Sequence, residues 1–314
     1  MVTATPGRRS AQRSMITVML GVALLACGLQ GCTKQRERAD QPPPTSPVPR
    51  ATATLFDGGR AFGLLREQVK DYGWRPAGSK ESHRLAARLR TLLPRGRFES
   101  VPQHPGLRNV VGSIPGRSPA ILVAAHYDVE ARPRGFVGAN DGAAGTAAVV
   151  TLARALAAAP RPRNARALRF ALFDGEEEPA GCKPLTSCGL RGSTAYAARH
   201  ADKIMTVIVL DHIADRRGLS FRRERGSEAG LWSELRRAAY DVGVGSLFPS
   251  STTKKPIPSG HTAFANRGLP AIDVTDAVYP QRDSLADDLD AVSPRSLDAV
   301  GEAVYRLLVR RRGR

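Results

Sequence analysis

The sequence is poor in aromatic and acidic residues. Aromatic side chains make up 5% of its 314 residues, and 29 acidic residues stand against 47 lysines and arginines, so the formal net charge is +18. A balance this basic favours anionic partners. The sequence nevertheless shows no recognition helix, no RNA-binding signature and few rings to stack on bases. We therefore predict no nucleic-acid partner and interpret the charge as an arginine-rich, solvated surface.

The apolar run near the N-terminus is too short to cross a membrane. It covers residues 15–26 after a basic stretch, whereas a spanning helix needs about 20 apolar residues. This order predicts a secretory signal over residues 1–31. Residues 29–32 (LQGC) resemble a bacterial lipobox, which predicts lipidation of Cys32 and anchoring at the bacterial cell envelope; an ordinary secretory signal is the alternative.

The rest of the chain divides into a short tether and one domain. Residues 32–54 are polar and rich in proline, which is typical of an unstructured linker. Residues 55–314 form a region of ordinary enzyme size, long enough to bury a sizeable core. We find no internal repeat and no indication of the oligomeric state.

Only four cysteines are present, and two of them belong to the N-terminal segment. Cys27 would leave with the signal and Cys32 would carry the lipid. Cys182 and Cys188 remain, and outside the cytoplasm such a pair favours a disulfide that closes a small loop. Two thiolates at this spacing could also bind zinc, but no second pair completes such a site. We therefore predict the disulfide.

Strand-like apolar runs alternate with helical patterns after residue 55. Strands are predicted at 107–114, 120–126, 167–173, 204–211 and 269–276, and helices at 56–73, 79–93, 142–158, 192–201, 227–243 and 293–311. Ser79 and Ser293 are the expected N-caps of two of these helices. The alternation predicts an α/β fold with a mostly parallel central sheet and helices on both faces.

Several of the predicted strands stop at residues that bind metals. The carboxyl ends of parallel strands meet along one edge of a sheet, where ligands gather in open α/β proteins. The residues at these ends, with one aspartate from a glycine-rich turn, are His126, Asp128, Asp141, Glu176, Glu177 and Asp211. Such imidazole and carboxylate groups suit one or two divalent ions. The pattern therefore predicts the metal site of a hydrolase.

Two of these segments have simpler explanations when taken alone. Glu176 and Glu177 suit a division of labour between general base and metal ligand, and Glu178 could replace either in a shifted register, but an acidic triplet is more often a solvated turn. The turn around Asp141 could simply cap a helix, and it lacks the lysine of a phosphate loop. The apolar strand before the glutamates and the ligands elsewhere favour the site.

Eight stretches of the sequence resemble the zinc-dependent exopeptidase family that includes bacterial leucyl aminopeptidases and glutaminyl cyclases. The resemblance extends over about residues 55–311, and the stretches are, in order, RPAGS, AAHYD, GANDGAAGTAAVVTLARAL, FALFDGEEE, LRGSTAYA, VLDHIAD, HTAFANRGLPAIDV and DDLDAVSPRSL. The resemblance implies the phosphorylase/hydrolase-like α/β fold of zinc exopeptidases.

The resemblance also implies metal ligands. His126 and Asp211 would bind one ion, and Asp141 would bridge to a second. Glu177 would bind that second ion. The implied cofactor is zinc, as one or two ions, with manganese or cobalt as alternatives.

The implied catalytic residues are Glu176, as general base, and Asp128, which would orient the imidazole of His126. Near the C-terminus the sequence departs from the family, because Asp283 stands where the family usually has its last histidine ligand. An aspartate there would shift metal preference toward harder ions; alternatively, it lies on a solvated loop and the second ion is weak or absent. His261 follows a glycine instead of the family's aspartate, and we expect it to line the pocket or support the site indirectly.

The implied activity is that of a metal-dependent exopeptidase, an aminopeptidase that removes N-terminal residues of peptides with metal-activated water and Glu176. Two alternatives stay open. One is a glutaminyl-peptide cyclotransferase with a single zinc ion. The other is a catalytically weak envelope lipoprotein that binds peptide.

Overall fold

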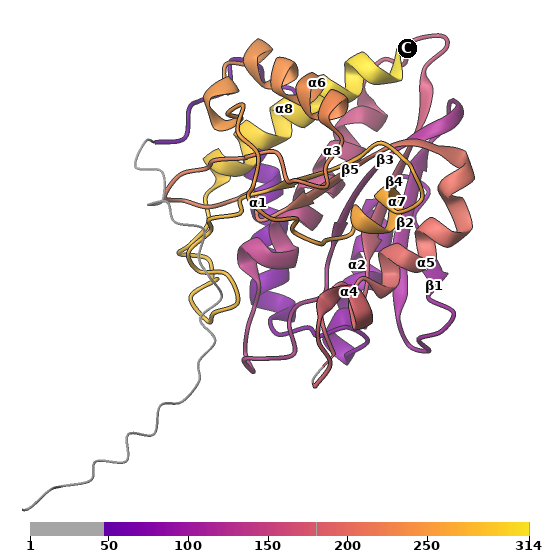
Figure 1. The fold of residues 1–314 in the computed structure, drawn as a ribbon, viewed down its shortest axis with the longest axis vertical. Coiled ribbons are helices and arrows are strands. Elements are labelled where there is room, and N and C mark those ends of the chain that lie inside the picture. The colour runs from indigo at the N-terminus through magenta and orange to yellow at the C-terminus, as the bar shows by residue number, and fades with distance from the viewer. Residues whose placement is uncertain (1–46, 180, 314) are drawn as a thin grey trace, which may run out of the picture. The chain divides into compact units, whose positions relative to one another are not determined.

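The structure, a computed structural model, describes residues 47–179 and 181–313 (Figure 1). The predicted signal, Cys32 and most of the predicted tether lie outside these residues. Contacts with the domain begin before residue 55, because Val48 is buried and the N–H of Thr52 donates to the carbonyl of Val242 at 2.9 Å. Within the described residues, no helix has both the length and the apolar character that a membrane crossing requires.

Six strands form one sheet in the order β1-β2-β4-β3-β5-β6. Their bounds are β1 Arg97–Ser100, β2 Arg108–Ile114, β3 Arg117–His126, β4 Arg166–Phe173, β5 Ile204–Asp211 and β6 Ala271–Thr275. Five of the six lie where the sequence predicted a strand, and the short edge strand β1 was not predicted.

The helices lie between these strands and at both ends of the domain. The α-helices are α1 Gly58–Glu67, α2 Lys80–Leu92, α3 Gly145–Ala158, α4 Leu185–Cys188, α5 Arg191–His200, α6 Ala229–Asp241, α7 Thr262–Ala265 and α8 Pro294–Arg312. Shorter π and 3₁₀ segments are η1 Gln68–Tyr72, η2 Ala139–Ala144, η3 Ala201–Lys203 and η4 Gly245–Leu247.

The sheet is mixed. Strands β4, β3, β5 and β6 run parallel, whereas β2 is antiparallel to both of its neighbours, β1 and β4. Only two residues, Pro115 and Gly116, connect β2 to β3. So short a link reverses the chain, because a return in the same direction needs a crossover of a dozen or more residues. The α/β prediction is confirmed, with the parallel part confined to the four strands that carry the site.

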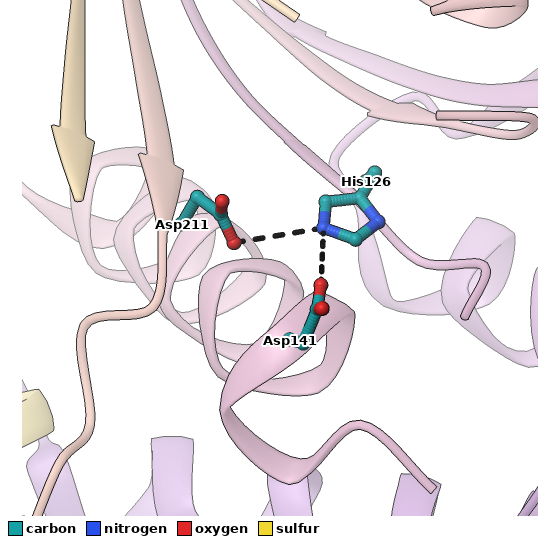
Figure 2. Close-up of side chains that lie close together, drawn as sticks. All are labelled: His126, Asp141 and Asp211. Carbon is teal, nitrogen blue, oxygen red and sulfur yellow. Dashed lines mark ion pairs between the residues drawn. The ribbon is translucent and has the colours of Figure 1, made fainter. Parts of the chain in front are cut away.

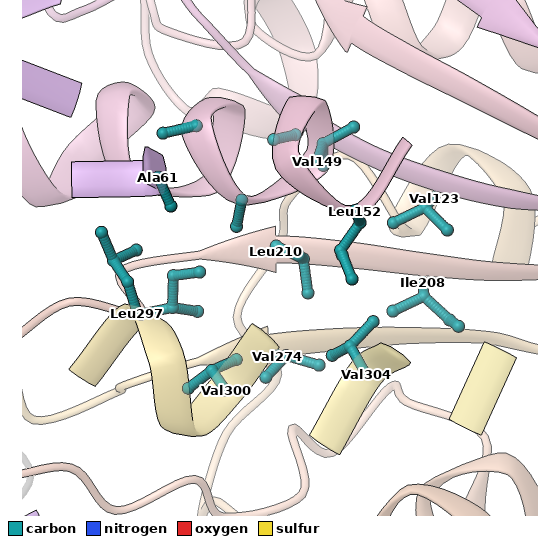
Figure 3. Close-up of a cluster of buried hydrophobic side chains, with 14 of the residues drawn as sticks. Ala61, Val123, Val149, Leu152, Ile208, Leu210, Val274, Leu297, Val300 and Val304 are labelled. Atoms are coloured by element: carbon teal, nitrogen blue, oxygen red, sulfur yellow. The ribbon is translucent and has the colours of Figure 1, made fainter. Parts of the chain in front are cut away.

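Alternate residues of the central strand β3 point to opposite faces of the sheet, as a period of two requires. Ile121, Val123 and Ala125 join a large apolar cluster with α1, α2, α3, α6 and α8, part of which is drawn in Figure 3. Leu122 and Ala124 join a smaller cluster with α5 and α7. Helices therefore cover both faces, as predicted, and every side chain from Ala120 to His126 is buried.

The two predicted N-caps are confirmed. Ser79 Oγ accepts a hydrogen bond from the N–H of Ser82 at 3.1 Å, and Ser293 Oγ accepts one from the N–H of Arg295 at the same distance. Each cap satisfies a backbone donor that the first turn of a helix leaves unpaired.

The predicted disulfide is present. Cys182 and Cys188 are bonded, with their Cα atoms 6.2 Å apart. The bond closes a small loop between β4 and α5, shortly after the two glutamates of the site.

Candidate metal centre

Three of the predicted ligands converge at the carboxyl edge of the parallel strands. His126 ends β3, Asp211 ends β5, and Asp141 lies in η2 just before α3. Each offers one ligand atom, and these atoms lie within 4.8 Å of one another. His126 Nε2 is 3.2 Å from Asp141 Oδ1 and 3.6 Å from Asp211 Oδ1 (Figure 2). We call these three residues the ligand group.

Asp128 connects the end of β3 to both glutamates. Its Oδ1 accepts a hydrogen bond from the N–H of Glu176 at 3.1 Å, and its Oδ2 accepts one from the N–H of Glu177 at 3.2 Å. On the other side, Nδ1 of His126 lies 3.1 Å from the Asp128 carbonyl oxygen and 3.7 Å from Oδ1. Asp128 is fully buried, so it can position the imidazole and the glutamate backbone together.

The loop that carries Asp141 is held by Asp287, for which the sequence analysis assigned no role. Asp287 Oδ1 and Oδ2 accept hydrogen bonds from the N–H groups of Asn140 and Asp141 at 2.9 and 3.0 Å. Gly142 follows in the left-handed region at φ +92°, and a Cβ there would lie 2.7 Å from the carbonyl oxygen of Asp128. Only glycine fits this approach, and it allows Asp141 to point at His126.

Arg75 lies beneath this loop and is fully buried. Its guanidinium donates to the carbonyls of Tyr127 at 2.8 Å, Gly73 at 3.0 Å and Val137 at 2.6 Å. It therefore ties the end of β3 to the segment before Asp141. Burial lowers the pKa of Arg75 to about 10, even though nearby aspartates oppose that effect.

Glu176 presents an oxygen that has no hydrogen-bond partner among the described residues. This atom, Oε2, is buried, and a Cβ at Gly260 would lie 3.5 Å from it. Burial raises the pKa of Glu176 to about 8, and nearby aspartates add to the rise. A buried carboxyl group that titrates near neutral pH is suited to general acid and base catalysis.

Glu177 lies beside the ligand group but not within it. Its Oε1 is 4.0 Å from Nδ1 of His126, the ring nitrogen opposite the one that faces the aspartates. Burial raises the pKa of Glu177 well above its usual value. Glu178 instead lies 3.6 Å from the ammonium group of Lys183.

His212 also lies at the site, a position for which the sequence predicted no role. Its Nδ1 is 2.8 Å from Asp211 Oδ2, and its Nε2 is 3.6 Å from Asp141 Oδ2. Burial and Arg282 lower the pKa of His212, but the two aspartates outweigh them and raise it to about 10. The pKa of His126 is also raised, because its aspartates outweigh its burial.

Asp283 follows β6 in a turn and adopts a left-handed backbone at φ +57°. It is not among the three residues that form the ligand group, and its role as a ligand stays a prediction. The preceding Arg282 donates to the carbonyl of Asp276 at 3.2 Å. Burial lowers the pKa of Arg282, but Asp211 and Asp141 outweigh burial and raise it.

His261 belongs to a buried network next to Glu176. Its Nε2 lies 3.0 Å from Glu224 Oε2 and its Nδ1 lies 2.9 Å from Ser259 Oγ. Both ring nitrogens are thus engaged away from the ligand group. Burial alone would raise the pKa of Glu224, but hydrogen bonds from His261 and two backbone amides lower it to about 2.

The roles of four residues at or next to the site were missed from sequence. Three of them, Arg75, His212 and Asp287, lie inside stretches that carry the family resemblance. The resemblance could therefore have drawn attention to them, but the sequence does not show which residues they contact. Glu224 lies outside those stretches, and only its position against His261 reveals it.

The donor set fits a zinc ion. One imidazole nitrogen and two carboxylate oxygens converge, and three protein ligands are typical of catalytic zinc. Oδ1 of Asp211, which points into the group, is buried without a hydrogen-bond partner within residues 47–179 and 181–313. A buried carboxylate oxygen is costly to leave unpaired, and a cation between the three atoms would satisfy it.

Comparisons with known proteins identify the family of this chain. The profile of peptidase family M28 matches residues 109–308. The chain is 26% identical over 199 residues to the aminopeptidase YwaD of Bacillus subtilis, which covers 59% of this chain and 39% of that protein. The match thus spans well under half of that relative.

Two solved structures have a similar fold over nearly their whole length. A glutaminyl cyclase of Porphyromonas gingivalis has a TM-score of 0.72 and 24% identity, and the match covers 82% of this chain and 100% of that one. A Zn-dependent exopeptidase of Parabacteroides distasonis has a TM-score of 0.70 and 21% identity, covering 83% and 99%. The family profile covers more than half of the chain, including all the residues of the ligand group. The chain therefore belongs to peptidase family M28.

Proposed function

We propose that this protein is an aminopeptidase that removes N-terminal residues from peptides. The observation that carries the proposal is the carboxyl group of Glu176, which is buried beside the ligand group with Oε2 unpartnered within the described parts of the chain. The similarity to an aminopeptidase supports the same substrate class.

The residues of the site would divide the reaction as follows. His126, Asp141 and Asp211 would hold the ion, which would supply Lewis-acid polarisation of the scissile carbonyl and activation of water. Glu176 Oε2 accepts the proton of the attacking water and then donates it to the nitrogen of the leaving amine. Asp128 holds the backbone of Glu176 in place during both transfers.

A second candidate is glutaminyl-peptide cyclotransfer, in which the α-amine of an N-terminal glutamine attacks its own side-chain amide and releases ammonia. Similarity to glutaminyl cyclases over nearly the whole of those chains favours this candidate. Glu176 would serve it by moving a proton from the attacking amine to the departing ammonia.

One assay separates the two candidates. The mature protein, loaded with zinc, is incubated with peptides that differ only in their N-terminal residue, and the products are identified by mass spectrometry. Release of free amino acid supports the aminopeptidase. Release of ammonia from the glutaminyl peptide alone refutes it in favour of the cyclase, and no product from any peptide contradicts both. Glu176→Gln should slow whichever reaction is seen by about 10²–10⁴-fold, and Glu178→Gln is the matched control.

We also propose that the mature protein is anchored at the cell envelope through lipid on Cys32. The support is the sequence of residues 29–32 and the apolar run before it. Labelled palmitate should enter the wild-type protein and not Cys32→Ala, which should leave the membrane fraction. An unlabelled wild-type protein would refute the anchor.

A further inference from the structure

The two aspartates of the ligand group divide their oxygens between two histidines. Oδ1 of Asp141 and of Asp211 faces His126 Nε2, at 3.2 and 3.6 Å. The other oxygen of each faces His212: Asp141 Oδ2 lies 3.6 Å from Nε2 and Asp211 Oδ2 lies 2.8 Å from Nδ1. One imidazole therefore lies close to the outer oxygens of both carboxylates, although neither of its ring nitrogens forms a hydrogen bond within residues 47–179 and 181–313.

This division bears on whether Asp141 bridges two ions. A bridging aspartate gives one oxygen to each ion, so a second ion would need Asp141 Oδ2, the atom that faces His212. A catalytic zinc ion takes three protein ligands. Within residues 47–179 and 181–313, the ligand group is the one place where three such donors meet, and it includes neither Glu177 nor Asp283. Around Asp141 Oδ2, the described residues therefore gather no second group of three donors.

The surroundings hold His212 firmly in this place. The ring is buried, with 2% of the residue exposed, and its centre is 5.7 Å from that of Tyr279. The backbone of His212 is left-handed at φ +48°. A residue other than glycine occupies that region at a cost, and such strain persists where packing over-determines it.

Arg282 adds a permanent positive charge near the two aspartates. Its charge interacts with those of Asp141 and Asp211, and a hydrogen bond to the carbonyl of Asp276 holds its guanidinium. An arginine is always protonated, so it opposes a second dication near these carboxylates while compensating their charge.

We propose that this protein binds a single divalent ion, at His126, Asp141 and Asp211, and that His212 and Arg282 occupy the side on which a second ion would sit. The inference rests on the proposed metal-dependent function and specifies its metal content. Asp283 then has no part in metal binding.

The test is a metal count that does not depend on activity. The mature protein is purified in detergent, stripped with a chelator, equilibrated with zinc and dialysed, and its zinc is measured by elemental analysis. We expect one equivalent in the wild type, one in Asp283→Asn, and less than a tenth of an equivalent in His126→Ala. If His126→Ala does not fold, as judged by circular dichroism, Asp211→Asn replaces it with the same expectation.

A second measurement uses the cobalt-substituted protein, because two neighbouring Co²⁺ ions couple magnetically, whereas a single Co²⁺ ion has no partner to couple with. We expect the electron paramagnetic resonance spectrum of isolated Co²⁺. Two equivalents of zinc in the wild type, falling to one in Asp283→Asn or His212→Gln, would overturn the inference. So would a spin-coupled cobalt spectrum, or a wild type that binds no ion.

Failure of this inference is distinguishable from failure of the proposed function. Two bound ions together with release of amino acids would overturn the single-ion inference and leave the aminopeptidase intact. One bound ion without release of amino acid or ammonia would leave the single-ion inference intact and overturn the aminopeptidase.

Discussion

Replacing Asp128 by asparagine tests whether one buried carboxylate organises the site. In the wild type its two oxygens accept the N–H groups of Glu176 and Glu177 at 3.1 and 3.2 Å, and the residue is fully buried. Asparagine has nearly the same shape but only one acceptor oxygen. One of the two bonds therefore becomes a contact between two donors.

The magnitude follows from those two bonds. Losing one hydrogen bond to a charged acceptor costs about 1.5–3 kcal/mol, and the buried N–H left without an acceptor adds about 1–3 kcal/mol. We expect Asp128→Asn to lower the free energy of unfolding by about 2.5–6 kcal/mol, a large part of the about 5–15 kcal/mol typical of a domain. Because the displaced amide belongs to one of the two glutamates, turnover should also fall by at least about tenfold.

The assay is urea unfolding followed by circular dichroism, with peptide hydrolysis measured on the same samples. Asp202→Asn is the matched control, because it makes the same chemical change at an exposed position and should shift stability by less than about 0.5 kcal/mol. If Asp128→Asn unfolds within about 1 kcal/mol of the wild type, the two amides find other acceptors. The positioning role assigned to Asp128 is then refuted.

Three further predictions concern the other parts of the site. Glu176→Gln should lower turnover by about 10²–10⁴-fold, since it removes the general base, while metal content measured by elemental analysis stays at the wild-type value; loss of metal would mean that base and ligand are misassigned. The pKa of Glu224 falls from 4.5 to about 2 on folding, so its contribution, about 3 kcal/mol, is complete above pH 4.5 and is lost as the pH falls toward 2. Between pH 6 and pH 3, the free energy of unfolding should therefore fall less in Glu224→Gln than in the wild type, as measured by unfolding curves at both pH values. An equal fall in the two proteins would contradict the pairing with His261. Arg75→Met should lower the free energy of unfolding by about 3 kcal/mol or more, because several buried carbonyls lose a charged donor. It should also weaken zinc binding measured by calorimetry, and unchanged zinc affinity would show that the loop before Asp141 does not depend on Arg75.

The elements that were predicted correctly have local signals. Strands β3 and β5 are continuous apolar runs, as expected for strands buried on both faces. The caps at Ser79 and Ser293 also depend on nearby residues alone, because the capped amides lie two or three positions along the chain. The short edge strand β1 carries no such signal, since its half-exposed pattern depends on pairing with β2.

The residues of the candidate site also divide into those that local sequence signals predict and those that only long-range contacts place. His126 and Asp211 could be placed at the sheet edge from sequence, because each ends an apolar strand and parallel strands bring their carboxyl ends together. The resemblance to a known family added the assignment of ligands to ions, with His126 and Asp211 on one ion and Asp141 as the bridge to a second. These assignments needed no knowledge of long-range contacts.

By itself, then, the sequence determined the α/β class, the position of the strands that carry the site, the pair of bonded cysteines and the kind of ligands that meet. Only the tertiary structure decided that β2 pairs with β4, that Asp287 and Arg75 hold the loop of Asp141, and that His212 faces the outer oxygens of both aspartates. The physical reason is the sequence separation of the partners. Asp287 and Asp141 are 146 positions apart, and no local pattern of residues specifies which distant groups a folded chain brings within hydrogen-bond distance.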